Sequence, residues 1–253
     1  IAFSLFIFNL SAQENSFEND PIDLRQSEER KFRFGMQFSP HISWLSPNTE
    51  NYKGEGSSFG FNYGLSTEFF LTKNYLFSTG LIIANLGGKV SYEGLYEDNN
   101  GVQIPSAVEQ SFRIKYIEIP LTLKLRTNEI GYMTYYGQFG LKTGVKFQST
   151  SDYVYTDINN SPEVSGKNTA GDIFFMNMYL TMGAGVEYSI SGNTSLMLGI
   201  TYNNGFINQL SQDSYLLDAD GKATLDAKGN PIYTDKTPSA NLNYVALNIA
   251  LYF

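Results

Sequence analysis

Eight charged side chains interrupt stretches of otherwise small and polar residues, and they are the first candidates for chemistry in this sequence. The eight are Arg33, Glu68, Glu118, Lys124, Arg126, Lys142, Lys146 and Glu187. If all of them face one narrow interior, they could line a gated path for ions. Alternatively, they could form a plug of paired side chains, because a charge that is removed from water must be paired.

One ion pair within this lumen charge network can be predicted from spacing. If the hairpin between segments 117–126 and 135–147 pairs Arg126 with Thr134, then Glu118 falls opposite Lys142. Opposite charges that face each other across two strands attract. We therefore predict an ion pair between Glu118 and Lys142.

Enzymatic chemistry has little support in the sequence. His41 is the one histidine, and it lies in Ser39-Pro40-His41-Ile42 without the neighbouring serine motif or carboxylate pair that acid-base or triad chemistry needs. The chain has no cysteine, which removes disulfides and thiolate zinc sites. We predict no catalytic residue, no cofactor and no metal site, and we expect His41 to be an interfacial or loop residue.

A repeated motif, LDADGK at 217–222 and LDAKGN at 225–230, is the most distinctive feature of the connecting segments. Asp-Gly and Gly-Asn favour tight turns, so we predict a small β-ribbon here. The segment Asp218-x-Asp220-Gly221 is similar to the opening of a calcium-binding loop. However, the later ligands of such a loop, including its bidentate glutamate, are absent, and we predict turns rather than a calcium site.

The elements that would position the charged residues are strands, because the dominant period from Lys31 onward is two. Residues 59–71 are the clearest example, since bulky Phe, Tyr and Leu alternate there with Gly, Asn, Ser and Glu. Seven further segments repeat this alternation. The eight runs are 32–39, 59–71, 77–84, 117–126, 135–147, 177–188, 196–203 and 245–253.

The two faces of these runs indicate what surrounds the strands. The bulky face carries no charge in the centre of any run, as expected where a lipid-facing charge at the membrane midplane costs about 2–4 kcal/mol. The other face consists mostly of small or uncharged residues, which suits a narrow barrel interior better than a solvated surface. We therefore predict an all-β fold, an eight-stranded antiparallel up-and-down transmembrane β-barrel over residues 31–253. Its interior would be just wide enough for side chains to fill, which favours the plug over the ion path.

The connections between the runs alternate in length. Short links near 73–74, 128–129 and 191–193 alternate with four long ones, which include the polar segments 92–110 and 149–172. Barrels of the outer membrane have short periplasmic turns and long external loops, so we predict an outer-membrane protein with both termini periplasmic. Aromatic residues near the ends of the runs would form interfacial girdles. They are Trp44, Tyr75, Tyr92, Tyr116, Tyr132, Tyr188, Tyr202 and Tyr252.

Residues 1–30 differ from the rest of the chain. Residues 1–12, with the apolar run IAFSLFIFNL followed by Ser11-Ala12, match the remnant of a secretory signal peptide. The charged residues 13–30 are typical of a flexible periplasmic lead-in. A mean hydropathy of −0.23 and the lack of any run of about 20 apolar residues exclude a helical membrane protein. The formal net charge of −8 argues against a nucleic-acid partner.

Three segments carry a resemblance to a known family. KYIEIPLTLKLRT at 115–127, GYMTYYGQFGLKTGVKF at 131–147 and AGVEYSISGNTSLMLGITYNNGF at 184–206 resemble the PorT-type outer-membrane barrel proteins of Bacteroidota. The resemblance implies an eight-stranded barrel in a Bacteroidota outer membrane. The founding member of the family serves type IX secretion and gliding. The resemblance implies only a loose connection of this chain with that function. Glu118, Pro120 and Lys124 match the motif as structural positions, and no catalytic residue is carried over.

Two functional hypotheses of different classes follow from the sequence. The first is a non-enzymatic structural or accessory component of an outer-membrane assembly, with a role in secretion as one form of it. Such a barrel would contact outer-membrane lipid and a protein partner through its loops or its wall. The alternative is a narrow porin-like conduit for ions or small solutes. An enzyme that acts on lipid is a more distant third.

Overall fold

Strands form the regular structure of the chain, for which a computed structural model describes residues 31–98, 100–160 and 162–253. They are β1 (Phe32–Pro47), β2 (Tyr52–Phe70), β3 (Tyr75–Glu97), β4 (Gln103–Arg126), β5 (Met133–Tyr155), β6 (Glu163–Asn168), β7 (Met176–Ser191), β8 (Thr194–Gly205), β9 (Ser214–Tyr215), β10 (Tyr233–Thr234) and β11 (Ala240–Tyr252). The predicted signal-peptide remnant (1–12) and lead-in (13–30) lie outside the described residues. Within the described ranges, no helix is long and apolar enough to cross a membrane.

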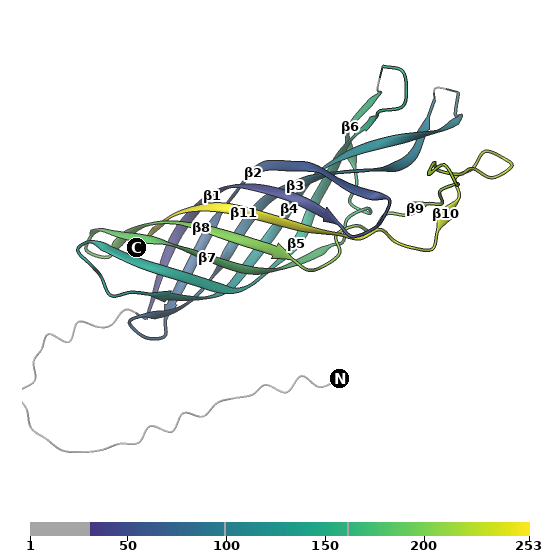
Figure 1. Cartoon of the computed structure of the whole chain (residues 1–253). Helices are drawn as coiled ribbons and strands as arrows, with labels where there is room; N and C mark the ends of the chain where they lie inside the picture. Colours follow the sequence, from purple (N-terminus) through teal and green to yellow (C-terminus); the bar gives the residue numbers. More distant parts are fainter. Residues whose placement is uncertain (1–30, 99, 161) are drawn as a thin grey trace, which may run out of the picture. The chain divides into compact units, whose positions relative to one another are not determined.

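Eight of the strands close into a barrel (Figure 1). Their order around the wall is β4, β3, β2, β1, β11, β8, β7 and β5, and a further pairing of β5 with β4 closes the ring. Each of these neighbouring pairs is antiparallel. The predicted eight-stranded antiparallel barrel is confirmed, and each of the eight alternating runs lies on one strand of it. β6 pairs with the outer part of β5, and β9 pairs with β10 in a separate ribbon.

The alternation of the sequence determines the two surfaces of the barrel wall. In β2, Phe59 and Leu65 expose 76% and 62% of their surface, whereas Asn62 and Glu68 are buried. Successive side chains of a strand point to opposite faces, so bulky apolar groups cover the outside and small or polar groups face the lumen. The wall is therefore apolar toward its surroundings and polar toward its interior.

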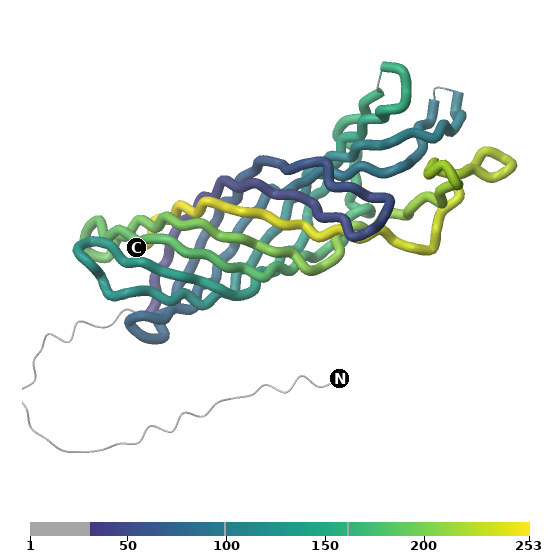
Figure 2. The backbone as a smooth tube through the Cα atoms, viewed as in Figure 1, coloured from purple at the N-terminus to yellow at the C-terminus, as the bar shows by residue number. Residues whose placement is uncertain are grey.

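The two ends of the barrel differ. At one end the strands are joined by the short segments 71–74, 127–132 and 192–193, and Lys31 and Phe253 lie at this short-turn end, bonded to Phe70 and Phe34. At the other, long-loop end, β3, β4 and β5 continue well past the rest of the wall (Figure 2). Two connections there, 48–51 and 98–102, are themselves short.

The polar segments 92–110 and 149–172, which we expected to be loops, are therefore largely strand. β3 and β4 form one long hairpin whose pairing begins at Glu97 and Gln103, and β5 follows β4 as far as the pair between Val108 and Tyr155. Polar residues are compatible with strands here because one face of the hairpin is partly exposed, while buried polar groups on the other face, such as Gln110, are hydrogen-bonded. Polarity alone did not distinguish such an extended hairpin from a loop.

The predicted aromatic girdle is correct for some of its members and wrong for others. Tyr75, Tyr132 and Tyr188 are exposed on the outer surface. By contrast, Tyr116 and Tyr252 are buried inside the barrel. The reason is strand parity: Tyr116 lies two residues before the inward-facing Glu118, so its ring points into the lumen as well.

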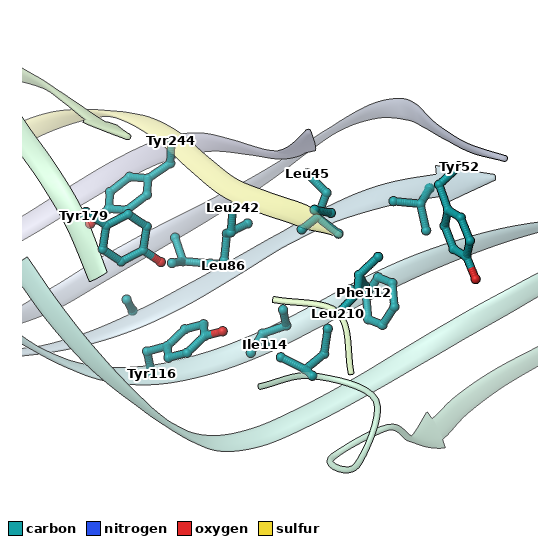
Figure 3. Packing of buried hydrophobic residues seen from close by; sticks show 14 of the residues in the cluster. Leu45, Tyr52, Leu86, Phe112, Ile114, Tyr116, Tyr179, Leu210, Leu242 and Tyr244 are labelled. Atoms are coloured by element: carbon teal, nitrogen blue, oxygen red, sulfur yellow. The ribbon is translucent and has the colours of Figure 1, made fainter. Parts of the chain in front are cut away.

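The main buried apolar cluster lies in the half of the lumen toward the long-loop end. It combines wall residues such as Phe112, Ile114 and Leu242 with Ile173 and Leu210, which belong to connecting segments. Figure 3 shows Leu210 on a segment without strand structure that passes close to Phe112 and Ile114. Two connecting segments therefore fold back into the mouth of the barrel.

Candidate functional site

Five of the predicted charges meet inside the short-turn end of the lumen and form what we call the ion cluster. They are Arg33, Glu68, Lys124, Arg126 and Glu187. Arg33 Nε donates to Glu68 Oε2 at 2.7 Å, and Arg33 Nη2 donates to Glu187 Oε1 at 2.7 Å. Lys124 contacts Glu68 directly and lies 3.3 Å from Glu187. Arg126 reaches Glu187 at 3.5 Å.

Strand order explains why the ion cluster forms. Arg33 and Glu68 are direct cross-strand partners on β1 and β2, and both face inward. Lys124 and Glu187 come from β4 and β7 across the lumen, where long side chains can reach the first pair. With three cations and two carboxylates the cluster carries a formal charge of +1, and each buried carboxylate has more than one cationic partner. Such multiple pairing is what makes charge burial tolerable.

Aromatic rings enclose the ion cluster. The ring of Tyr252 lies 4.4 Å from the guanidinium carbon of Arg33, and the ring of Tyr136 lies 4.5 Å from Lys124 Nζ. Tyr136 fits because Gly199 has no side chain at this point, where a Cβ would come within 2.0 Å of the tyrosine hydroxyl. The small residues of the inner face thus make room for the large ones, and the interior is filled.

A second charged group lies deeper, toward the middle of the lumen. Tyr244 donates its hydroxyl hydrogen to Glu118 Oε2 at 2.9 Å and accepts a bond of 2.7 Å from Lys142 Nζ. Lys142 Nζ also lies 3.6 Å from Glu118 Oε2. All three groups are buried, and the phenol and the ammonium both engage Oε2 of the carboxylate, whereas the buried Glu118 Oε1 has no hydrogen-bond partner.

The predicted register of this hairpin is wrong by two residues. Arg126 pairs with Tyr136 rather than Thr134, and Glu118 pairs with Gly144 rather than Lys142. The turn at 127–132 is longer than the pattern indicated, which shifts β5 against β4. An even shift leaves every side chain on its predicted face, so Glu118 and Lys142 remain in the same lumen and meet diagonally.

Lys146 joins neither group. It lies near the long-loop end, where its Nζ donates to the carbonyl oxygens of Ala170 and Ile173. Both carbonyls belong to a connecting segment that folds into the mouth. Lys146 thus anchors this segment and does not contribute to an ion pair with the other seven predicted charges.

His41 is placed differently from our expectation of an interfacial or loop residue. It lies within β1, is 2% exposed, and its ring centroid is 5.5 Å from that of Tyr244. Its position two residues after the inward-facing Ser39 is the signal that would have placed it in the lumen. Among the described residues, no group of three or more His, Asp or Glu side chains could hold a metal ion.

Above the second charged group, Ile173, Gln209 and Leu210 close the mouth, and we call these three residues the mouth plug. A hydrogen bond from Phe174 N to Gln209 O joins the two in-folded segments, and Gln209 N donates to Ala240 O. Sequence reasoning did not find the mouth plug, because both segments lie between strands and have no periodic pattern. Their short apolar groups around 173 and 210 were the one available signal.

One cavity within the lumen is small. Between the ion cluster and Lys142 lies a cavity of about 40 Å³, lined by Gln138, Thr181, Met197 and Thr201 among others. This volume holds a few water molecules at most. The barrel interior is consequently a stack of paired charges, a small polar cavity and an apolar layer.

A larger cavity of about 360 Å³ lies at the long-loop end, and we call it the tyrosine cleft. Its aromatic lining consists of Tyr92, Tyr153, Tyr155, Tyr215 and Tyr233. Burial, with a smaller contribution from the neighbouring Tyr233, raises the pKa of Tyr215 to about 12. Tyr215 is therefore a neutral phenol at physiological pH.

The family comparison agrees with this architecture. The sequence matches the family described as outer membrane protein beta-barrel domain over residues 12–211. No curated protein matches the sequence. Solved structures with a similar fold include surface protein A of Neisseria, with 11% identity over 87% of this chain and 95% of that chain, at a TM-score of 0.40.

OprG of Pseudomonas aeruginosa is also similar, with 10% identity over 88% of this chain and 95% of that chain, at a TM-score of 0.42. The attachment invasion locus protein Ail of Yersinia pestis shares 12% identity over 88% of this chain and 97% of that chain, at a TM-score of 0.33. At these levels of identity and TM-score, the similarities support no statement about function.

Proposed function

Because this chain belongs to the outer membrane protein beta-barrel domain family, we propose that it is a closed, non-enzymatic barrel that serves as a structural or accessory component of an outer-membrane assembly. The family places the protein in the outer membrane, where the apolar wall contacts lipid. The working surfaces would be the long-loop end and the wall, because binding residues concentrate on loops that a rigid scaffold holds in place.

The filled lumen is the observation that carries this proposal. An ion path needs a continuous water-filled passage. Here the charges of the ion cluster are paired, Glu118 is paired with Lys142, and the mouth plug covers both groups. A conduit would have to break several buried ion pairs at once, which is costly because each released charge would stay desolvated. The geometry therefore favours an anchor over a conduit.

The proposal includes an orientation and a division of the chain. Short turns face the periplasm in outer-membrane barrels, and Lys31 and Phe253 lie at the short-turn end. We place both termini in the periplasm and the tyrosine cleft outside the cell, with residues 1–12 as a signal-peptide remnant and 13–30 as a lead-in. The three segments quoted above support membership of the PorT-type branch and a role near a secretion assembly.

Electrical recording in planar bilayers tests the closed state directly. The purified full-length protein should give no stable conductance across a range of voltages, and a general porin inserted in the same bilayer serves as the positive control. Steady, voltage-insensitive openings from the purified barrel would contradict the proposal and support the conduit.

Purification from native membranes tests the accessory role. A tag on an exposed loop position such as Gly229 should recover a partner protein in fixed stoichiometry after mild detergent extraction. Recovery of the barrel alone, under conditions that preserve other outer-membrane complexes, would argue against an assembly component.

A further inference from the structure

The tyrosine cleft has the chemistry of a binding site that the closed lumen does not use. Its floor continues the inner face of β3, β4 and β5 beyond the rest of the barrel, and the segment around Gln212 to Tyr233 forms its other side. A volume of about 360 Å³ lies within the range of small-molecule and side-chain sites in proteins. The cleft is thus a concave surface of a size that can enclose a ligand.

The aromatic rings of the cleft are held in position by one another and by an amide. Tyr215 and Tyr233 stack with their centroids 5.2 Å apart and 28° between their planes. Tyr92 donates to Gln110 Oε1 at 3.1 Å, and Gln110 Nε2 donates to the Tyr153 hydroxyl at 2.9 Å. Gln110 is fully buried, so it fixes two rings from beneath. The ring faces are therefore preorganised, which reduces the entropy lost on binding.

The charges of the cleft indicate the sign of its ligand. Its lining includes the carboxylates Glu97, Asp172 and Asp213 but a single cation, Lys167, which leaves a formal charge of −2. An anionic ligand would meet net repulsion here. A cation would be attracted both by the carboxylates and by the negative faces of the tyrosine rings.

One internal contact shows how a cation sits in this cleft. Lys167, on the exposed strand β6, places its Nζ 5.2 Å from the centroid of the Tyr153 ring. Tyr153 is a buried, fixed ring, whereas Lys167 is an exposed and flexible side chain. Lys167 thus occupies the ring face as a replaceable internal cation.

We propose that the tyrosine cleft binds an organic cation, an alkylammonium or guanidinium group, which takes the place of Lys167 on the face of Tyr153. The proposal deepens the loop-based accessory role and rests on it, since it names the chemistry that the long-loop end recognises. A basic side chain of a protein partner and a free amine would supply the same group. The cleft volume exceeds that of one cationic group, so part of the attached chain would also be enclosed.

Calorimetric titration of the full-length protein in detergent micelles tests this inference. The probes are N-acetyl-arginine amide as the cation, N-acetyl-glutamine amide as its neutral counterpart, and maltose as a neutral sugar. An arginine-containing tripeptide forms a further arm, and tighter binding of the tripeptide than of the free amide identifies a protein source. We expect binding of the cationic probes, weakening with salt, and no binding of the neutral ones.

Substitution of the internal cation gives the decisive result. Lys167→Gln removes the competitor from the Tyr153 face, so the affinity for N-acetyl-arginine amide should rise about two- to fivefold. Lys222→Gln makes the same change in net charge outside the cleft and should leave the affinity nearly unchanged. Tyr153→Leu should weaken binding by a similar factor.

An unchanged or lower affinity of Lys167→Gln, or preferential binding of maltose, would overturn the cation assignment. That failure is distinguishable from failure of the proposed function. A barrel that remains electrically silent and retains its partner, but does not bind the cation, would keep the accessory role and lose only the ligand class.

Discussion

The hydroxyl of Tyr116 donates a hydrogen bond of 2.6 Å to Oε1 of Gln209, and this buried contact joins the barrel wall to the mouth plug. Gln209 also donates through its Nε2 to the carbonyl of Ile207 at 3.1 Å. A segment without regular structure is thereby tied to a strand 93 residues away in sequence. The closed mouth therefore has a buried hydrogen bond to the wall in addition to its apolar packing.

Gln209→Ala should loosen the mouth plug. The substitution leaves the buried Tyr116 hydroxyl without its acceptor, a loss of about 1–3 kcal/mol in the free energy that holds the segment in place. Faster amide hydrogen exchange at residues 206–212, measured by mass spectrometry, would report it. Tyr116→Phe should have a smaller effect, because Gln209 keeps its other bonds, and Gln103→Ala is a control outside the lumen. Equal exchange in all variants would show that the bond does not hold the segment.

Lys124→Met should strongly destabilise the barrel. Lys124 is 1% exposed and contacts both Glu68 and Glu187, so its removal leaves two carboxylates with fewer partners in a desolvated place. Breaking a buried pair in this way costs about 3–5 kcal/mol of unfolding free energy. Urea unfolding in lipid vesicles, followed by the shift between folded and unfolded bands on a gel, measures the change.

The double variant Lys124→Met with Glu68→Gln should recover part of that loss, because it removes one of the uncompensated charges. Lys53→Met, at an exposed position of β2, is the matched control and should unfold like the unmodified protein. A single variant as stable as this control would mean that the ion cluster does not support the fold.

Leu65→Arg tests the outer surface of the wall. Leu65 is exposed, and its partners on the two neighbouring strands are Met36 and Leu81, so the site lies in a fully apolar part of the surface. An arginine at the membrane midplane costs about 2–4 kcal/mol of unfolding free energy. Ser57→Arg, further along the same strand, is the control and should cost about 0–1 kcal/mol near the interface. Equal costs at both positions would contradict a membrane-spanning wall at Leu65.

The turn at Asp226 should persist under mild acid. A side-chain hydrogen bond from Asn230, together with backbone N–H groups of Asn230 and Lys228, lowers the pKa of Asp226. A lowered pKa in the folded state gives stability that is present above the unfolded pKa and is lost as pH falls through the folded value. Amide protection of Lys228 and Asn230 should therefore be unchanged from pH 7 to 5 and decline below the ordinary pKa of aspartate. Asp226→Ala should abolish this protection at every pH.

The sequence by itself determined the eight alternating runs, the number of strands in the wall and the face of each side chain within those runs. These properties follow from a period of two, which is local, since neighbouring residues of a strand point to opposite sides whatever lies around them. The same alternation also places Tyr116 and His41 on the inward face. We had instead interpreted Tyr116 as a member of the aromatic girdle and His41 as an interfacial or loop residue. For the same reason, the alternation predicted that the exterior is apolar and that Glu68 and Glu187 face the lumen.

Only the tertiary structure decided how these faces meet. The register of β4 against β5 depends on the geometry of the turn at 127–132, which no alternation encodes, and the two-residue shift changed the partner of Glu118. The mouth plug and the tyrosine cleft depend on contacts between segments far apart in sequence, such as Tyr116 with Gln209 and Tyr52 with the cleft residue Gln212. Periodicity describes a strand and its two sides, whereas closure of a lumen is a property of the side chains that several strands and connecting segments bring to one place.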